Sequence, residues 1–126
     1  MRAVAPVLHV RDVVRAHDYY AEKLGFRSPR MWGDPPVFCI PQRDGLALML
    51  SQIEQGAEVR PIGWDENDWS AYFWVEDADA LHAEFKAGGA DISREPQDKV
   101  YGTREFEIRD LDGHVLAFGH DTTGVA

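Results

Sequence analysis

The feature that most constrains the fold of this chain is a sequence pattern that occurs twice. Val10-Arg11-Asp12 in the first half is matched 65 residues later by Val75-Glu76-Asp77. Tyr20 is matched at the same offset by Phe85. In each half an apolar run precedes the aspartate and an amphipathic segment follows it, which predicts a strand, then a helix, then a ladder of further strands.

The first module is predicted over residues 3–53. Asp12 is a favourable N-cap and Gly25 a favourable stop for a helix between them. Val14, Tyr20 and Leu24 are predicted to form the buried stripe of this helix. We expect a strand over residues 4–10, the helix from Val13 to Leu24, and strands over 26–32, 36–42 and 46–52.

The second module, over residues 69–121, is predicted to repeat this order. Asp77 is its helix cap, and the turn at Asp112-Gly113 matches Asp44-Gly45, where the offset has grown to 68 residues. We expect a strand over residues 70–75, a helix over 78–88, and strands near 91–95, 103–109 and 114–120. The polar residues 54–68 join the modules, and a length of 126 residues predicts a single domain.

Strand periodicity divides the side chains of each predicted sheet between a helix-covered face and an open face. Val4, Leu8 and Val10 are predicted on the covered face, as are Phe106 and Ile108. The open face is predicted to carry Ala5, Val7, His9, Ser70, Tyr72, Trp74, Glu105, Glu107, Arg109, Val115, Ala117 and Gly119. An aromatic and charged face opposite a helix-covered one indicates an α+β domain with a cupped binding surface.

Composition excludes several classes of protein. The formal net charge is −9, with no cluster of cations, which disfavours nucleic-acid binding and favours a cationic ligand. No apolar run is long enough to cross a membrane, and the N-terminus lacks the apolar core of a signal peptide. The single Cys39 cannot form an intrachain disulfide, so a cytoplasmic location is expected.

Three segments together resemble a known family. Val7-Leu8-His9-Val10-Arg11-Asp12 leads to Tyr19-Tyr20 and Leu24-Gly25-Phe26, Tyr101-Gly102-Thr103-Arg104-Glu105-Phe106 leads to Asp110-Leu111-Asp112-Gly113, and Trp74-Val75-Glu76-Asp77 lies between them. The chain resembles the vicinal oxygen chelate superfamily, which includes glyoxalase I, extradiol dioxygenases, fosfomycin-resistance transferases and bleomycin-resistance proteins. The resemblance covers essentially the whole chain and implies two tandem βαβββ modules that form a cupped mixed sheet.

In the enzymes of this superfamily, the first and fourth strands of each module supply the ligands of one divalent metal. The resemblance places those positions at Ala5, Met49, Ser70 and Ala117. Alanine has no donor atom, and a serine hydroxyl and a thioether are poor ligands for the cations this family uses. No metal or other cofactor is therefore expected.

The lack of metal-ligating residues is typical of the bleomycin-resistance branch, to which the chain is most similar. Members of that branch bind their ligand without a chemical reaction. The resemblance implies a homodimer that sequesters a large cationic antibiotic, and exchange of the N-terminal strands with a hinge at Pro6 is one arrangement of such a dimer. We therefore predict a metal-free protein that binds a hydrophobic or aromatic, cationic small molecule. The candidate ligand-binding residues are His9, Trp32, Phe38, Met49, Tyr72, Trp74, Tyr101 and Glu107, with Trp64 a weaker candidate and Trp69 predicted to be structural.

Other interpretations stay open at this point. A metal-dependent lyase or oxygenase of the same superfamily would need a displaced metal site, for which only His9 and Glu107 are candidates. A dimeric interaction protein would use the aromatic residues as its interface. Glu105 and Glu107 could attract a cationic ligand, or Arg104 and Glu105 could simply connect neighbouring strands. His17 and His82 are predicted at the surface, and Cys39 as a buried or semi-buried unreactive thiol.

Overall fold

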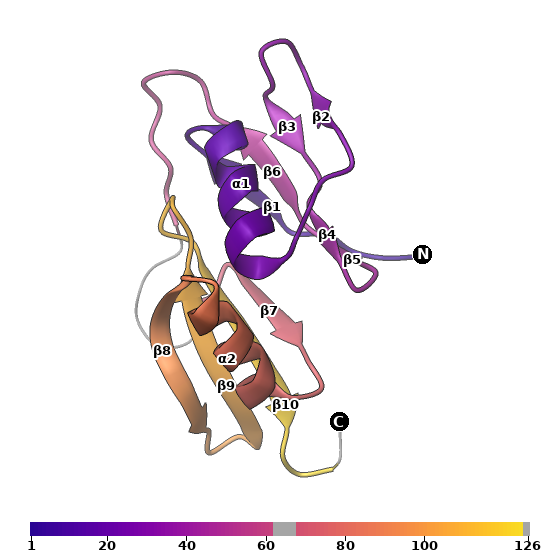
Figure 1. Ribbon diagram of the computed structural model, residues 1–126, viewed down its shortest axis with the longest axis vertical. Helices are drawn as coiled ribbons and strands as arrows, with labels where there is room; N and C mark the ends of the chain where they lie inside the picture. The colour runs from indigo at the N-terminus through magenta and orange to yellow at the C-terminus, as the bar shows by residue number, and fades with distance from the viewer. Residues whose placement is uncertain (62–67, 125–126) are drawn as a thin grey trace. The chain divides into compact units, whose positions relative to one another are not determined.

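The computed structural model describes residues 1–61 and 68–124. It divides the chain into two compact units, Met1–Pro61 and Ile62–Ala126, so the boundary lies within the predicted joint. Each unit contains one helix and one main sheet (Figure 1). The α+β architecture with two modules is thereby confirmed. That both modules form a single domain stays a prediction.

The first unit is a four-stranded sheet with one helix. Its main sheet has the strand order β1-β6-β3-β2, in which β1 and β6 are parallel and the other neighbours antiparallel. A short hairpin, β4-β5, turns at Asp44 and Gly45, both of which have positive φ. The elements are β1 (Val7–Val10), α1 (Val13–Leu24), β2 (Met31–Trp32), β3 (Phe38–Cys39), β4 (Gln42–Arg43), β5 (Leu46–Ala47) and β6 (Met49–Gln52).

Both ends of α1 lie where the sequence predicts them. The Asp12 carboxylate accepts hydrogen bonds from the backbone N–H groups of Val14 and Arg15, at 3.1 Å each. Gly25 adopts the left-handed conformation, and its N–H donates back to Ala21. These two caps satisfy backbone groups that a helix leaves without partners at its ends.

The core of the first unit lies between α1 and the sheet. The inward-facing residues of neighbouring strands and of the helix are almost fully buried: Leu8, Val10, Val13, Ala16, Tyr20, Leu24, Cys39, Leu48 and Leu50. Val13, not the predicted Val14, belongs to the buried stripe, since Val14 is 41% exposed. The stripe instead follows the spacing 13, 16, 20 and 24, which keeps to one side of a helix with 3.6 residues per turn.

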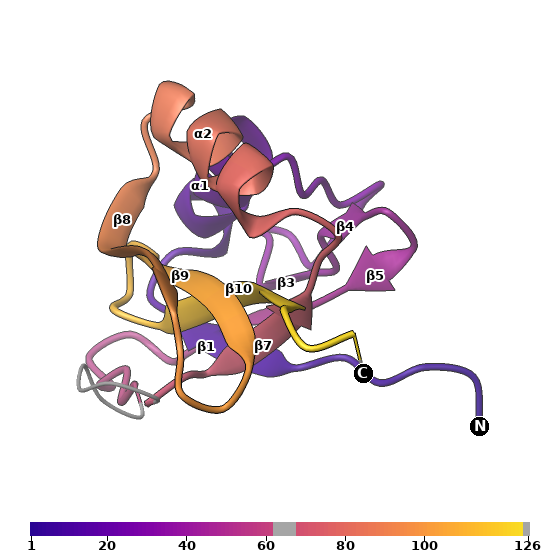
Figure 2. The same ribbon diagram turned by 90° about the horizontal axis from the view of Figure 1, so that it is seen from below.

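The second unit has the strand order β7-β10-β9-β8, with α2 on one side of the sheet (Figure 2). β10 is parallel to β7 and antiparallel to β9. Its core is a cluster of phenylalanine rings from the sheet and from α2, in which Phe118 contacts Phe73, Phe85 and Phe106 with ring centroids 5.0–5.4 Å apart. The elements are β7 (Ala71–Trp74), α2 (Ala78–Ala87), β8 (Asp91–Asp98), β9 (Thr103–Arg109) and β10 (Val115–Asp121).

The strand registers show that the sequence repeat is a structural repeat. Val7 pairs with Met49 across β1 and β6, and Tyr72 pairs with Ala117 across β7 and β10. The first members of these pairs are 65 residues apart and the second members 68, which are the two offsets found in the sequence. Residues at these offsets are therefore called counterparts below.

The counterparts extend to the start of each helix. The Gln52 side-chain oxygen, at the end of β6, accepts a hydrogen bond from the backbone N–H of Val13 at 2.9 Å. His120 Nδ1, near the end of β10, accepts one from the N–H of Ala78 at 2.9 Å. In both units the strand parallel to the first strand thus supplies a second acceptor for the helix N-terminus.

Several strands of the first unit are shorter than predicted. The strand predicted over residues 36–42 is divided between β3 and β4, because Pro41 lacks the N–H that a continuous ladder needs. The strand predicted over 26–32 is reduced to β2 and one isolated bridge at Arg27. There Ser28 Oγ accepts a hydrogen bond from the N–H of Ile40 at 2.9 Å and so takes the place of a backbone acceptor.

The strand predicted over 46–52 is divided at Leu48 between β5 and β6, and the remaining differences lie at strand ends. The first strand begins at Val7 instead of residue 4, and Val4 is 93% exposed, so its predicted place under the helix is wrong. β8 continues past its predicted end to Asp98. Pro96 is tolerated there because β8 is an edge strand whose register shifts between Arg94 and Gln97.

Candidate functional site

The candidate residues lie on the open face of each sheet, which is the face opposite the helix. In the second unit the strand registers align two rows of residues across this face. Side chains in each row are cross-strand neighbours on the same side of the sheet. One row is Tyr72, Ala117, Glu107 and Arg94, and the other is Trp74, Gly119, Glu105 and Gln97.

Three aromatic rings run along the β7 edge of this face. The ring centroids of Trp69 and Tyr72 are 4.8 Å apart, and those of Tyr72 and Trp74 are 5.1 Å apart. Trp74 is 60% exposed, although it belongs to a contiguous aromatic surface. An exposed indole in such a row offers a flat apolar surface to a planar ligand.

Tyr72 extends over the neighbouring strand beside Gly119, the cross-strand partner of Trp74. A Cβ added to Gly119 would be 2.0 Å from the Tyr72 hydroxyl oxygen and 2.9 Å from the Glu105 Cβ. No side chain larger than hydrogen fits between them. The glycine therefore lets the phenol ring cross β10 and bring its hydroxyl group to β9.

The Tyr72 hydroxyl group meets the carboxylate of Glu105. The Tyr72 hydroxyl donates to Glu105 Oε1 at 3.1 Å, and the Thr103 hydroxyl donates to the same oxygen at 2.7 Å. Glu105 is 1% exposed. Burial, followed by the nearby Glu105 charge, raises the pKa of Tyr72 to about 12, so the phenol stays a neutral donor over the ordinary pH range.

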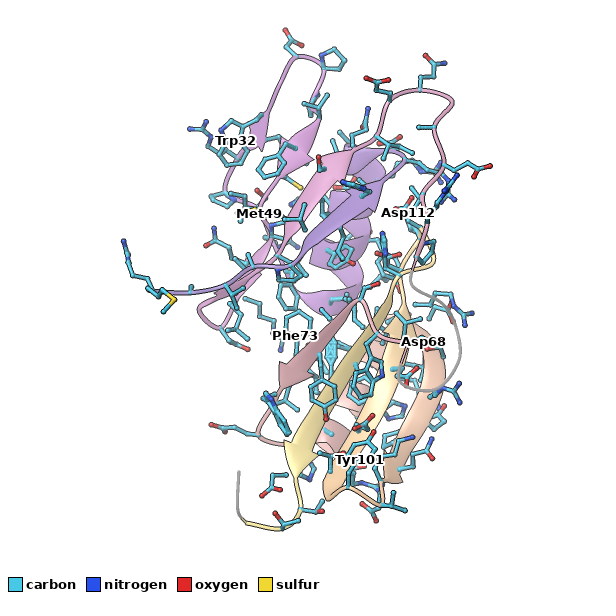
Figure 3. The ribbon with its side chains drawn as sticks, turned by 180° about the vertical axis from the view of Figure 1, so that it is seen from behind. Trp32, Met49, Asp68, Phe73, Tyr101 and Asp112 are labelled. Atoms are coloured by element: carbon cyan, nitrogen blue, oxygen red, sulfur yellow. The ribbon has the colours of Figure 1, made fainter. Side chains whose placement is uncertain are left out.

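Tyr101 covers the same carboxylate from the turn between β8 and β9. Burial and the adjoining Glu105 carboxylate raise the pKa of Tyr101 above its ordinary value. The residue is nevertheless 49% exposed, and Figure 3 shows it at the end of the second unit's sheet. Two of the predicted ligand-binding residues, Tyr72 and Tyr101, thus interact with Glu105, and a third, Trp74, contacts Tyr72.

Glu107 points to the same face but has other partners. Its Oε2 accepts a hydrogen bond from Trp69 Nε1 at 3.1 Å, and its Oε1 lies 3.3 Å from Arg94 Nε. The residue is 2% exposed. Trp69, predicted to be structural, therefore anchors the end of the aromatic row to a buried ion pair.

The open face of the first unit carries the other predicted residues. A row of cross-strand neighbours runs from His9 through Ser51 and Phe38 to Trp32. The rings of Trp32 and Phe38 are in contact, with centroids 5.5 Å apart, and the Arg30 guanidinium lies 4.1 Å from the Trp32 ring centre. Met49 is on the same face beside Val7, as Figure 3 shows for Met49 and Trp32. Trp64 lies outside the described residues.

The positions that the superfamily uses for metal ligands do not fit a metal here. Ala117 is fully buried and has no donor atom. Ser70 Oγ is 3.3 Å from His114 Nδ1, and Met49 offers only a thioether. Within residues 1–61 and 68–124, no group of three or more His, Cys, Asp or Glu side chains is arranged to hold a metal ion. No chemical step can be assigned to a metal at these positions.

The two helix histidines are less exposed than predicted. His17 and His82 side chains are each 14% exposed, so their predicted place at the surface is wrong. His17 Nε2 accepts a hydrogen bond from the N–H of Ser28, and His82 Nε2 lies 2.6 Å from Glu95 Oε2. Both rings thus connect a helix to the segment beside it, which buries them.

Cys39 is fully buried on the helix-covered face of β3. Burial raises the pKa of its thiol to about 11, so the reactive thiolate is disfavoured at neutral pH. The prediction of a buried, unreactive thiol is confirmed on the point of burial.

The sequence interpretation weighed Glu105 with Glu107 as a group that could attract a cationic ligand, but it did not include Glu105 among the candidate ligand-binding residues, and it assigned no function to Thr103 or Gly119. Strand parity alone signals that Glu105 faces the same side as Tyr72 and Trp74. The close approach of Tyr72 over Gly119 depends on a register between β7 and β10 that no local pattern reveals. A glycine in the middle of an otherwise apolar strand was the available signal.

Comparisons with known proteins agree with this architecture. The profile of the Glyoxalase/Bleomycin resistance protein/Dioxygenase superfamily matches residues 3–118. The chain belongs to this superfamily. The resemblance inferred from its motifs is thereby confirmed. No curated protein matches the sequence.

Solved structures resemble the chain over almost its whole length. TioX from Micromonospora sp. ML1 is 26% identical with a TM-score of 0.67, over 98% of this chain and 99% of that one. A bleomycin-binding protein from bleomycin-producing Streptomyces verticillus, complexed with copper(II)-bleomycin, is 22% identical with a TM-score of 0.70, over 94% of both chains. A glyoxalase-related enzyme from Clostridium phytofermentans is 20% identical with a TM-score of 0.74, over 96% of this chain and 95% of that one. The last two likenesses show the fold alone.

Among the described residues no helix is both long and apolar enough to cross a membrane.

Proposed function

We propose that this protein binds a small aromatic, cationic molecule on its open sheet faces, without a metal, and acts by sequestering that molecule. The observation that carries the proposal is the aromatic row of β7. Trp74 is 60% exposed at the end of this row, and Tyr72, whose ring contacts it, reaches a buried carboxylate on β9. Exposed aromatic surface beside negative charge is the combination that attracts aromatic cations.

The electrostatics of the whole chain support a cationic ligand. The formal net charge is −9, and both carboxylates on the open face of β9 are buried. The summed negative charge raises the local concentration of cations near the protein and accelerates their association. This contribution falls as the salt concentration rises, because salt screens charges over about 10 Å at 0.1 M.

Membership of the superfamily gives indirect support for ligand binding without a catalysed reaction. A protein with the same fold was solved with copper(II)-bleomycin bound, which shows that the fold can hold a large antibiotic. The metal-ligand positions of the enzymes carry alanine, serine and methionine here. Bleomycin, without and then with copper(II), is therefore the first ligand to test.

The test is a titration of tryptophan fluorescence with copper-free bleomycin, chosen because copper itself quenches fluorescence, followed by calorimetry with copper(II)-bleomycin. We expect saturable binding that Trp74→Ala weakens about 10-fold or more, since an aromatic contact contributes about 1–3 kcal/mol when a base or ring stacks on it. Leu111→Ala, at a residue 54% exposed in the turn between β9 and β10, is the matched control and should bind as the wild type does.

The oligomeric state distinguishes this proposal from the alternative that the aromatic residues form the interface of a dimeric interaction protein. We propose a homodimer, and light scattering of the wild type and of Trp74→Ala tests it. If Trp74→Ala binds ligand normally but dissociates into monomers, the aromatic row is a protein interface and the proposal is wrong. A full equivalent of tightly bound divalent metal in protein purified without chelator would also contradict it.

A further inference from the structure

Two buried carboxylates lie two residues apart on the open face of β9, and they differ in their partners. Glu107 interacts with the Arg94 guanidinium and with the indole N–H of Trp69. Glu105 interacts with neutral hydroxyl groups: those of Tyr72 and Thr103 donate to Oε1, and the Tyr101 hydroxyl also interacts with the carboxylate. The other oxygen, Glu105 Oε2, is buried and accepts no hydrogen bond from the residues that the structure describes.

Glu105 also lacks a counter-charge within the described part of the chain. No lysine, arginine or histidine there forms an ion pair with it, although Arg104 on the same strand pairs with Asp79 and Asp98. A buried carboxylate with one unsatisfied oxygen and no cation is costly, because burial removes the water that would otherwise solvate it. A ligand that supplies both a positive charge and an N–H donor would remove this cost.

The neighbours of Glu105 favour such a ligand. Tyr72 and Tyr101 place aromatic rings beside it, and Trp74 extends this aromatic surface through its contact with Tyr72. The faces of such rings attract cations. The pKa of Tyr72 is raised to about 12, so its hydroxyl remains a donor to Oε1 and leaves Oε2 as the acceptor for the ligand. A neutral aromatic molecule could stack on Trp74 but could not compensate the charge below it.

We propose that Glu105 is the charge-recognition residue of this face, and that it accepts an N–H hydrogen bond from an ammonium or amidinium group on an aromatic ligand. The inference rests on the proposed function and gives it a chemical class of ligand. It also assigns the recognition to Glu105 instead of Glu107, which already has a cationic partner.

Access to Glu105 is through Tyr101. Tyr72 is held between Trp69 and Trp74 and fits closely over Gly119. Tyr101 lies in a turn and is 49% exposed, so its ring can move without opening the sheet. Displacement of the Tyr101 ring by the ligand ring would uncover Oε2.

Three probes that share a benzyl group separate charge recognition from stacking: benzylamine, which is protonated at pH 7, benzyl alcohol, which is neutral and of similar size, and the bulkier benzyltrimethylammonium, which is charged but has no N–H. Binding is measured by chemical-shift titration of the ¹⁵N-labelled protein. We expect the wild type to bind benzylamine about 10-fold more tightly than the other two, the difference that one hydrogen bond to a charged group provides.

Glu105→Gln should abolish this preference while leaving the binding of benzyl alcohol unchanged. Glu95→Gln removes the same charge from an exposed residue that pairs with His82, and it should keep the preference. Loss of the preference in Glu107→Gln but not in Glu105→Gln would overturn the assignment.

Other outcomes distinguish this inference from the proposed function. If all three probes bind equally well to the wild type, the face binds aromatic molecules but Glu105 does not recognise charge, and only the inference is wrong. If none binds, both are wrong. Should Glu105→Gln not fold, the ¹³C resonance of the Glu105 carboxyl in the wild type replaces it: a shift with benzylamine but not with benzyl alcohol supports the inference, and no shift overturns it.

Discussion

The open faces of the two units differ although their backbones repeat one another. The first unit carries the row His9, Ser51, Phe38 and Trp32, and the second carries Trp74, Gly119, Glu105 and Gln97 at the corresponding places. His9 and Trp74 are counterparts, as are Ser51 and Gly119. The charge of the second row lies under aromatic rings, whereas the first row contains no carboxylate.

This difference shows how a duplicated fold can hold two kinds of surface. Hydrogen bonds within the sheets and the packing under the helices require only the backbone and the covered face. The open face is then free to vary. In the second unit one glycine, Gly119, allows a tyrosine to cross its strand and reach Glu105. Ser51, the counterpart of Gly119, has no tyrosine beside it, because the counterpart of Tyr72 is Val7.

The largest effects on stability are expected for substitutions in the cores of the two units. Phe118 and Leu50 are counterparts on the covered faces, and both are buried. Phe118→Ala should lower the free energy of unfolding by about 3–5 kcal/mol and Leu50→Ala by about 2–5 kcal/mol. Denaturant unfolding followed by circular dichroism checks both values. A loss below about 1 kcal/mol for Phe118→Ala would mean that its contacts with three phenylalanine rings do not hold the second unit together.

The next effect is expected at the glycine that distinguishes the two open faces. Gly119→Ala should destabilise the protein by about 1–3 kcal/mol, because its Cβ would overlap the Tyr72 hydroxyl and the Glu105 side chain. The control, Ser51→Ala, should change stability by less than about 0.5 kcal/mol. Thermal unfolding measures both. Gly119→Ala combined with Tyr72→Val, the residue type of the first unit, should regain part of the loss.

Cys39 gives the first unit a pH dependence of its own. The folded state raises the pKa of this thiol from about 9 to about 11, so its stabilising contribution is complete below pH 9 and is lost as the pH rises toward 11. The free energy of unfolding should fall by about 1 kcal/mol between pH 8 and pH 10. Denaturant unfolding across this range measures the slope. Cys39→Ala should flatten it, and an unchanged slope in that variant would contradict the assignment.

The smallest effect is expected at the second acceptors of the helix N-termini. His120→Ala should destabilise the protein by about 1 kcal/mol, as loss of an N-cap does, because the Ala78 N–H loses its partner. His120→Gln introduces the residue used in the first unit and should restore most of the loss. Thermal unfolding midpoints compare the three proteins. A glutamine variant no more stable than the alanine variant would show that the two caps are not equivalent.

Much of the fold is readable from local patterns. The helix Val13–Leu24 was predicted at its observed bounds because both of its caps are residues with strong preferences, Asp12 and Gly25. Strand parity correctly separated Leu8 and Val10 from His9, and Phe73 from Trp74. The short strands around Ser28 and Pro41 were overestimated, since side-chain hydrogen bonds and a missing N–H end a strand without changing its apolar pattern.

The candidate site was less accessible to the same reasoning. Parity places Glu105 and Glu107 on one face but cannot show that only Glu107 pairs with Arg94. That difference depends on a register shift in β8, which determines the residue opposite each carboxylate. Whether the eight predicted residues bind a ligand stays a prediction that the titrations above address.

The position of the last strand in each unit also fixes the order in which the protein can fold. β6 and β10 are the last main-sheet strands of their units along the chain, yet each pairs with the first strand and with a neighbour on its other side. Partners such as Val7 and Met49, or Tyr72 and Ala117, are more than 40 residues apart in sequence. Neither first strand can pair until its unit has been synthesised almost completely. Such non-local contacts slow folding and leave the earlier strands exposed in the meantime. During synthesis the first unit is therefore able to close once Gln52 is available, while the second must wait for β10.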